Sequence, residues 1–164
     1  MNLAHIHLIL NHVPVIGIPV ALLFLAYGLW AKNLSTQRFS LLVLSGLAAV
    51  VLPIYFTGEP AEKLIEHLPG FAESFLEPHE DAAKISLILT LLAGAVAFIA
   101  FWLQKSEQWR SRINLAVMAL AVVAMVSLLY TANLGGQVRH TELRSGSPGP
   151  SLENSDAKEK VDRD

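Results

Sequence analysis

The sequence predicts an all-α integral membrane protein, a bundle of four transmembrane helices. Hydrophobic residues make up 53% of the 164 positions and charged residues only 16%, whereas a soluble domain carries roughly 25% charged residues. Four blocks contain no formal charge, and they cover residues 1–31, 39–58, 85–104 and 113–138. Because a helix that crosses a bilayer needs about 20 mainly apolar residues, each block is long enough to cross once.

Helix-start and helix-stop signals place the spans more closely, at about residues 8–31, 39–57, 82–104 and 113–134. The first span contains Pro14, so it either begins near this proline or begins earlier and bends there. Thr57-Gly58-Glu59-Pro60 is a strong signal for the end of the second span. Pro78 followed by acidic residues is typical of a helix N-terminus and opens the third span. The fourth span meets Gly135-Gly136.

The segments outside the spans complete one membrane domain over residues 1–144. The connection 58–81 is expected to form a short amphipathic helix on the membrane surface, interrupted at Pro69-Gly70. Its apolar residues recur at helical spacing among acids: Leu64, Ile65, Leu68, Phe71, Phe75 and Leu76. Residues 145–164 are polar and rich in Ser, Pro, Gly and charge, which predicts a disordered tail.

Basic residues predict the orientation, because short cytoplasmic loops are enriched in Lys and Arg. The two short loops, 32–38 and 105–112, contain Lys32, Arg38, Lys105, Arg110 and Arg112. The opposite side has an uncharged N-terminus and a mainly acidic connection. We therefore expect a bacterial inner-membrane protein with two cytoplasmic hairpins and with both termini in the periplasm.

Composition also excludes several classes of function. A net charge of −2 argues against a nucleic-acid binder, which needs a basic surface. The chain has no cysteine, which excludes disulfides, iron–sulfur clusters and thiolate metal sites. No charged side chain falls in mid-membrane, which disfavours ion transport. An enzyme is the least favoured class, because no nucleophile–base pair or phosphate-binding loop is present.

Histidines supply the most specific signal, because all six fall on the predicted outer side. They are His5, His7, His12, His67, His79 and His140. His5 and His67 are expected to be interfacial anchors. The other four are candidate ligands for a cofactor or a metal, because neutral imidazole binds Fe, Cu and Zn. The alternative for these four is a polar network that holds the outer helix ends together.

Two imidazoles on facing helices can ligate a haem iron from both sides. His79 suits this role, because a helix N-terminus disfavours the charged imidazolium form. If the last helix continues through His140, Gly136 lies beneath that ring, where a flat macrocycle could approach the backbone. Four basic side chains near the outer surface could meet haem propionates: Arg139, Arg144, Lys63 and Lys84.

In order along the chain, these motifs resemble a widespread bacterial family of four-helix inner-membrane proteins, known mainly as a domain of unknown function. The matching elements are the opening His7-x4-His12-x-Pro14, the Thr57-Gly58 turn, His79, and the closing Gly135-Gly136 with Arg139-His140. The resemblance covers residues 5–144 and departs from the family at Val13 and Gln137 and in the long acidic connection. It implies a membrane protein with outward-facing histidines, sometimes found with redox partners.

Three hypotheses for the function follow. The leading one is a b-type haem site at the periplasmic edge that serves electron transfer, with ligands among His7, His12, His79 and His140 and with a membrane redox complex or a periplasmic electron-transfer protein as partner. The second is a site for copper, zinc or iron, completed by Glu59, Glu80 or Asp81. The third is a structural or assembly subunit whose histidines only form hydrogen bonds.

Overall fold

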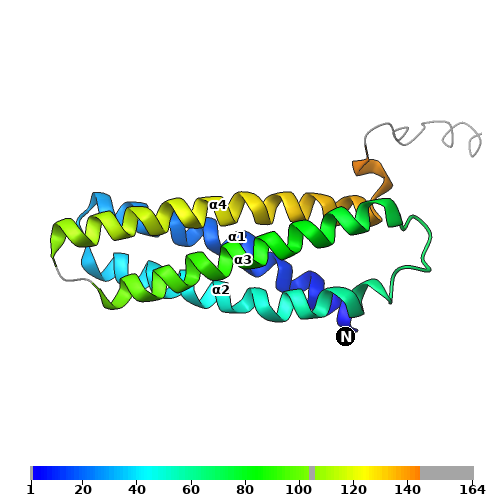
Figure 1. Ribbon diagram of the computed structural model, residues 1–164, viewed down its shortest axis with the longest axis horizontal. Helices are drawn as coiled ribbons and strands as arrows, with labels where there is room; N and C mark the ends of the chain where they lie inside the picture. The colour runs from blue at the N-terminus through cyan, green and yellow to red at the C-terminus, as the bar shows by residue number, and fades with distance from the viewer. Residues whose placement is uncertain (1, 104–105, 145–164) are drawn as a thin grey trace, which may run out of the picture.

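A computed structural model describes residues 2–103 and 106–144. The chain forms an up-and-down bundle of four long helices (Figure 1). The helices are α1 (Leu3–Trp30), α2 (Leu34–Glu62), α3 (Leu76–Trp102) and α4 (Glu107–Arg139). Two short 3₁₀ turns, η1 (Glu73–Phe75) and η2 (Thr141–Leu143), lie at one end. The predicted all-α four-helix bundle is confirmed.

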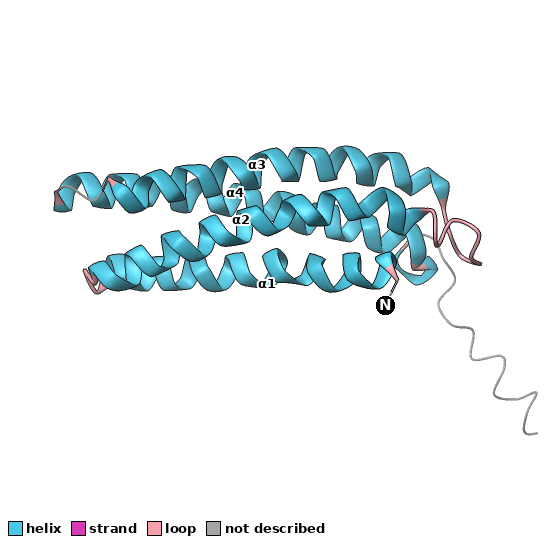
Figure 2. Cartoon of the chain, turned by 90° about the horizontal axis from the view of Figure 1, so that it is seen from below, coloured by secondary structure: helices cyan, strands magenta, loops and turns pink. Residues whose placement is uncertain are grey.

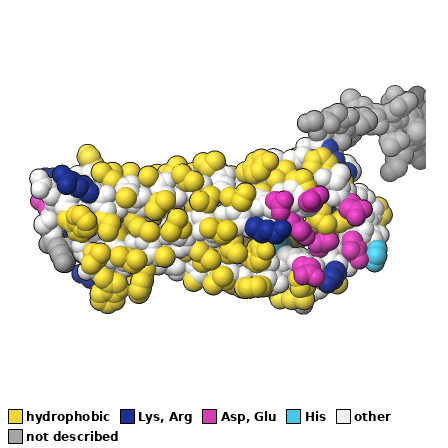
Figure 3. All heavy atoms as spheres, viewed as in Figure 1, with side chains coloured by type: hydrophobic (Ala, Val, Ile, Leu, Met, Phe, Trp, Pro, Cys, Tyr) yellow, Lys and Arg dark blue, Asp and Glu magenta, His cyan; other side chains and the backbone are white. Residues whose placement is uncertain are grey.

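The two ends of the bundle differ in what they contain. One end, called here the terminal end, holds the start of α1, the 63–72 connection and the end of α4 (Figures 1 and 2). The other, the hairpin end, holds the short connections between α1 and α2 and between α3 and α4. Acidic side chains gather at the terminal end, and Lys and Arg side chains lie at both ends (Figure 3).

Between these ends the surface is apolar, as expected of a protein that is surrounded by lipid. All four helices are long and apolar enough to cross a membrane. Large hydrophobic side chains point away from the bundle; Leu23 and Phe56 are each 71% exposed. A continuous apolar band of this size would be an aggregation hazard in water but is suited to a hydrocarbon environment. The chain is a multi-pass membrane protein.

Helix ends are set by local capping, and the helices are longer than the spans expected from hydropathy. Three N-caps bond their side-chain oxygen to a backbone N–H of the first turn: Asn2 to His5, Asn33 to Thr36 and Ser106 to Trp109. α1 begins at Leu3, well before Pro14, and includes Pro19 as well. The first helix therefore begins upstream of Pro14.

Inside the bundle, small side chains allow the helices to approach closely. Each helix packs against two neighbours in the cyclic order α1, α2, α3, α4, so α1 and α3 lie on a diagonal. Leu25, Leu41 and Val117 are fully buried. A methyl group at Gly94 of α3 would overlap Ala48 of α2, which shows how close these two helices are.

The amphipathic helix expected in the connection does not form, and this corrects the sequence-based expectation. α2 continues to Glu62, residues 63–70 form turns and a bend, and α3 begins at Leu76 after η1. Gly70 has a φ of 87°, a left-handed conformation that suits glycine and stops a helix. The tail predicted to be disordered, 145–164, lies outside the described residues.

Candidate functional site

Two of the six histidines, His7 and His79, point into the bundle at its terminal end. His7 lies in the second turn of α1 and His79 in the first turn of α3. Because neighbouring helices run in opposite directions, the start of each of these helices lies beside the end of the helix next to it. His7 therefore faces the end of α2, and His79 faces the end of α4. Both rings are half-buried.

The His7 ring is held by α2. Its Nδ1 lies 3.1 Å from the backbone carbonyl oxygen of Ile54 and 3.1 Å from the hydroxyl of Thr57. A carbonyl oxygen can only accept a hydrogen bond, so Nδ1 carries the proton and donates it. The Thr57 hydroxyl donates to the carbonyls of Pro53 and Ile54 and can accept from His7. Gly58 lies beside the ring, where a methyl group would be 3.7 Å from Cε1.

The His79 ring is held by α4 in the same way. Its Nδ1 donates to the backbone carbonyl oxygen of Thr131, at 3.0 Å. Gly135, one turn further along α4, lies directly against the ring, and a methyl group there would come within 2.8 Å of Cε1. Real side chains essentially never tolerate such a contact, so this ring position requires glycine at residue 135.

Together, His7 and His79 form a pair of anchored imidazoles on diagonal helices. His7 is anchored to α2 and His79 to α4, both at the terminal end of the bundle. Since Nδ1 of each neutral ring carries the hydrogen, Nε2 of each ring is unprotonated and has a lone pair free to bind a metal. A hydrogen bond from the other ring nitrogen to a carbonyl is the usual way in which a ligating histidine is oriented. This pair is the candidate site.

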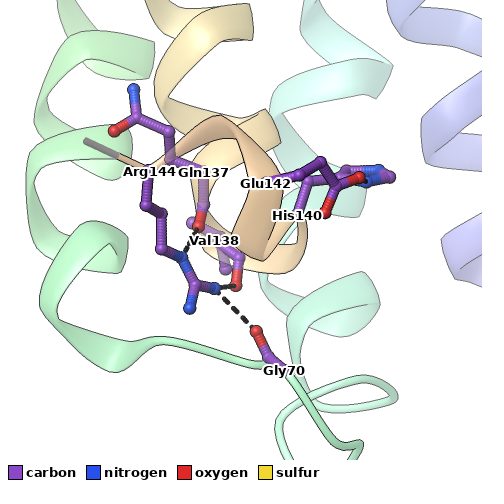
Figure 4. Close-up of polar contacts among 6 residues, drawn as sticks. All are labelled: Gly70, Gln137, Val138, His140, Glu142 and Arg144. Atoms are coloured by element: carbon purple, nitrogen blue, oxygen red, sulfur yellow. Dashed lines mark hydrogen bonds and ion pairs between the residues drawn. The ribbon is translucent and has the colours of Figure 1, made fainter. Parts of the chain in front are cut away.

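His12 and His140 lie apart from this pair. His12 is exposed, and its Nδ1 donates to the Leu8 carbonyl one turn back in the same helix, at 2.7 Å. His140 is exposed too, and its Nδ1 contacts the carboxylate of Glu142 at 2.9 Å (Figure 4). Hydrogen bonds from its own backbone N–H and from His140 lower the pKa of the Glu142 carboxyl. Of the four predicted ligands, only His7 and His79 bond to a neighbouring helix.

His5 and His67 are both exposed at the terminal end, and each contacts a residue nearby in the sequence. His5 Nδ1 lies 2.7 Å from the side-chain oxygen of Asn2, and His67 lies 3.3 Å from the carboxylate of Glu66. These contacts are what an interfacial side chain makes, and they do not connect helices.

Gly136 and Arg139, two further predicted site residues, contact other groups than a histidine ring. α4 ends at Arg139, so the condition that placed Gly136 beneath His140 is not met; a methyl group at Gly136 would instead approach Leu143. Arg139 donates to the Pro69 carbonyl, and Arg144 donates to the Gly70 carbonyl at 2.6 Å (Figure 4). These two arginines fasten the connection to the end of α4.

The lysines predicted near the propionates also have partners. Lys63 pairs with Glu59 at 2.6 Å, and Lys84 pairs with Asp81 at 2.9 Å. These pairs also use two of the three acids that were considered as additional metal ligands. Within residues 2–103 and 106–144, no three His, Cys, Asp or Glu side chains come together in a group that could hold a metal ion.

Sequence reasoning missed the groups that orient the two rings. The carbonyls of Ile54 and Thr131 leave no mark in a sequence, because every residue has one. Gly135 belongs to the Gly135-Gly136 pair, in which the sequence points to Gly136 as the glycine beneath a histidine. A separation of 56 residues hides the His79–Gly135 contact until the pairing of α3 with α4 is known.

Below His79, α3 and α4 share a cluster of hydroxyl groups. Ser86 Oγ lies 2.6 Å from Ser127 Oγ and 2.8 Å from Thr131 Oγ1. Thr131 also donates to the Ser127 carbonyl at 3.0 Å. Because Thr131 supplies the carbonyl that accepts from His79, this cluster fixes both the spacing of the two helices and the anchor of the ring.

Comparison with known proteins adds no relative. No protein-family model, no curated protein and no solved structure matches the chain at a significant level.

Proposed function

We propose that this membrane protein binds a b-type haem between His7 and His79 and serves electron transfer, either directly or as an accessory subunit of a membrane redox complex. The observation that carries the proposal is the matched pair of anchored imidazoles. Each ring is held at Nδ1 by a carbonyl of the neighbouring helix and keeps a free lone pair on Nε2.

The ligand set favours a haem over a metal ion held by the protein alone. A structural zinc or copper site needs three or four protein ligands, and no such group is found among the described residues. A haem brings four nitrogen ligands of its own and needs only one or two from the protein. Two imidazoles therefore suffice for haem and are too few for a bare ion.

Some residues of the site would ligate the haem, and others would leave room for it. His7 and His79 would hold the haem, and the carbonyls of Ile54 and Thr131 would fix the orientation of the two rings. Gly58 and Gly135 keep side chains away from the two rings. Bound there, a haem would supply one-electron exchange, with a potential that depends on the half-buried surroundings and on the anchored imidazoles.

The distribution of basic residues supports a bacterial inner-membrane location, with the candidate site at the periplasmic edge. Lys32, Arg38, Arg110 and Arg112 belong to the hairpin end, and Lys105 adds to them from outside the described residues. Short loops that are rich in such residues remain in the cytoplasm. The two termini and the histidine pair would then face the periplasm, where a periplasmic electron-transfer protein is the expected partner.

Absorption spectra test the proposal directly. The protein is expressed with an ample supply of haem, purified in detergent and measured before and after reduction. We expect a Soret band and reduced-state bands of a low-spin b-type haem. His7→Gln and His79→Gln should each remove or convert these bands to a high-spin form. His12→Gln and His140→Gln are matched controls, because both remove an exposed imidazole from the same end.

The same samples distinguish the alternatives. A spectrum without porphyrin, together with one equivalent of copper, zinc or iron, would favour a transition-metal module. A protein with neither, in which His7→Gln and His79→Gln lower only the stability, would favour a structural subunit. The hydrogen bonds of His7 and His79 support the structural subunit as a second candidate function, since they connect α1 to α2 and α3 to α4.

A further inference from the structure

Thr90 is a polar residue buried in the middle of α3 that has no hydrogen-bond partner among the described residues. Its side chain is 2% exposed, and its hydroxyl oxygen contacts no donor or acceptor of the described chain. Burying a hydroxyl group away from water without a hydrogen bond costs free energy. Inside a membrane no bulk water offsets that cost, so such a group indicates an additional binding partner.

The nearest polar neighbours of Thr90 along α3 belong to the hydroxyl cluster described above. Ser86 precedes Thr90 by four residues, so both side chains lie on the same face, one turn apart. Ser86 is 1% exposed and already contacts Ser127 and Thr131. This face continues with Ala93 and Ala97, which are buried as well.

An assignment of hydrogens shows that the cluster can accept one more bond. Thr131 donates to the Ser127 carbonyl, so Ser86 can donate to Thr131, and Ser127 can donate to Ser86. Each hydroxyl hydrogen then has one acceptor. The oxygen of Ser86 has two lone pairs and so far accepts only from Ser127, which leaves one lone pair for a further donor.

We propose that Ser86 and Thr90 hold one internal water molecule in the seam between α3 and α4. Thr90 donates to the water, and the water donates to Ser86. The bonded series then runs from Thr90 through the water to Ser86, Thr131 and the Ser127 carbonyl. A buried water typically makes about three hydrogen bonds, and Thr90 and Ser86 supply two of them. This site binds water whether or not a haem is present.

The site has a consequence for the neighbouring histidine. The bonded series includes Thr131, whose carbonyl anchors His79. Ser86 contacts the hydroxyl of this same residue, and the proposed water extends the polar series to Thr90, one turn further into the membrane.

Magnetic resonance in detergent micelles tests the proposal on the full chain. Magnetisation transfer from water to the methyl group of Thr90, in an otherwise deuterated protein, should give a cross-peak. Thr90→Ser keeps the hydroxyl group but has no methyl group, so the β-protons of the serine become the probe. The cross-peak from water should persist in this variant. It should disappear in Thr90→Val and in Ser86→Ala. Absence of the cross-peak in the unmodified protein overturns the proposal, even if a variant fails to fold.

Stability supplies a second, independent measurement. Thr90→Val keeps the shape of the side chain and removes the hydroxyl group. Loss of one satisfied buried hydrogen bond should raise the unfolding equilibrium constant by about fivefold. If Thr90 instead has no partner, valine is the better residue, and the variant unfolds no more readily than the unmodified protein. That result, or a cross-peak that survives Ser86→Ala, contradicts the assigned site.

Discussion

The imidazole of His79 rests against the α-carbon of Gly135, so closely that a single methyl group would come within 2.8 Å of Cε1. The contact joins the first turn of α3 to the last turns of α4. This contact and the hydrogen bond from His79 Nδ1 to the Thr131 carbonyl together fix the position of the ring.

Gly135→Ala should displace the His79 ring, because the new methyl group would overlap the ring and the α4 backbone that carries it cannot move away easily. We expect the free energy of unfolding in micelles to fall by about 1–3 kcal/mol, the usual cost of overpacking. If the haem proposal holds, the axial ligation seen in the absorption spectrum should change as well.

Gly46→Ala is the matched control for this substitution. Gly46 lies in α2, and a methyl group there meets nothing within 4 Å. Alanine in a helix interior is favoured over glycine by about 0.5–1 kcal/mol, so the control should be slightly more stable than the unmodified protein. Equal effects of both substitutions would contradict the assigned contact.

Exchanging Gly94 and Ala48 tests the close approach of α2 and α3. Gly94→Ala should destabilise the bundle, because its new methyl group would overlap that of Ala48. Ala48→Gly alone should cost about 1 kcal/mol from helix propensity. The double variant removes the overlap and should be more stable than Gly94→Ala, as measured by unfolding in mixed micelles. A double variant that shows the sum of both losses would show that the two positions do not touch.

Two buried amides connect three helices at the hairpin end. Gln37 donates to the Gly28 carbonyl at 2.8 Å and accepts from Asn114 at 2.9 Å, and both amide side chains are buried. Replacing either by Leu should destabilise the bundle, and a double-mutant cycle should give a coupling of about 0.6–1.7 kcal/mol, the average-to-maximum range for polar pairs in membranes. Strict additivity of the two substitutions would contradict the contact.

The proposed orientation can be tested by labelling, because the chain contains no cysteine that would give a background. Glu66→Cys lies at the terminal end and Gln108→Cys at the hairpin end, both at exposed positions. A maleimide that cannot cross membranes should label Glu66→Cys in spheroplasts with an intact membrane. It should label Gln108→Cys only after the membrane is permeabilised. The reverse pattern would place the histidine pair on the cytoplasmic side.

The sequence by itself determined the number of helices and their membrane environment. Four uncharged blocks separated by charged or turn-forming segments have few physical solutions, because every backbone group in lipid must be bonded within its own helix. The helix ends were less predictable. α2 and α4 extend beyond their apolar blocks to Glu62 and Arg139, since a helix continues past the lipid until a cap or a turn stops it.

The candidate site was only partly accessible from the sequence. A common side for the six histidines followed from the expected topology, and His7 and His79 were among the four selected. Their separation from His12 and His140 depends on which way each ring faces. That is decided by the rotation of α1 about its own axis and by the end of α4 at Arg139.

Tertiary structure alone decided what surrounds the two rings. The carbonyls of Ile54 and Thr131, the glycine against His79 and the hydroxyl cluster of Ser86, Ser127 and Thr131 bring together helices that are distant in the sequence. A hydrophobic pattern reports how much of a helix avoids water, but it does not distinguish lipid from a neighbouring helix, since both are apolar. The pairing of polar groups across helices therefore becomes visible only once the helices are packed.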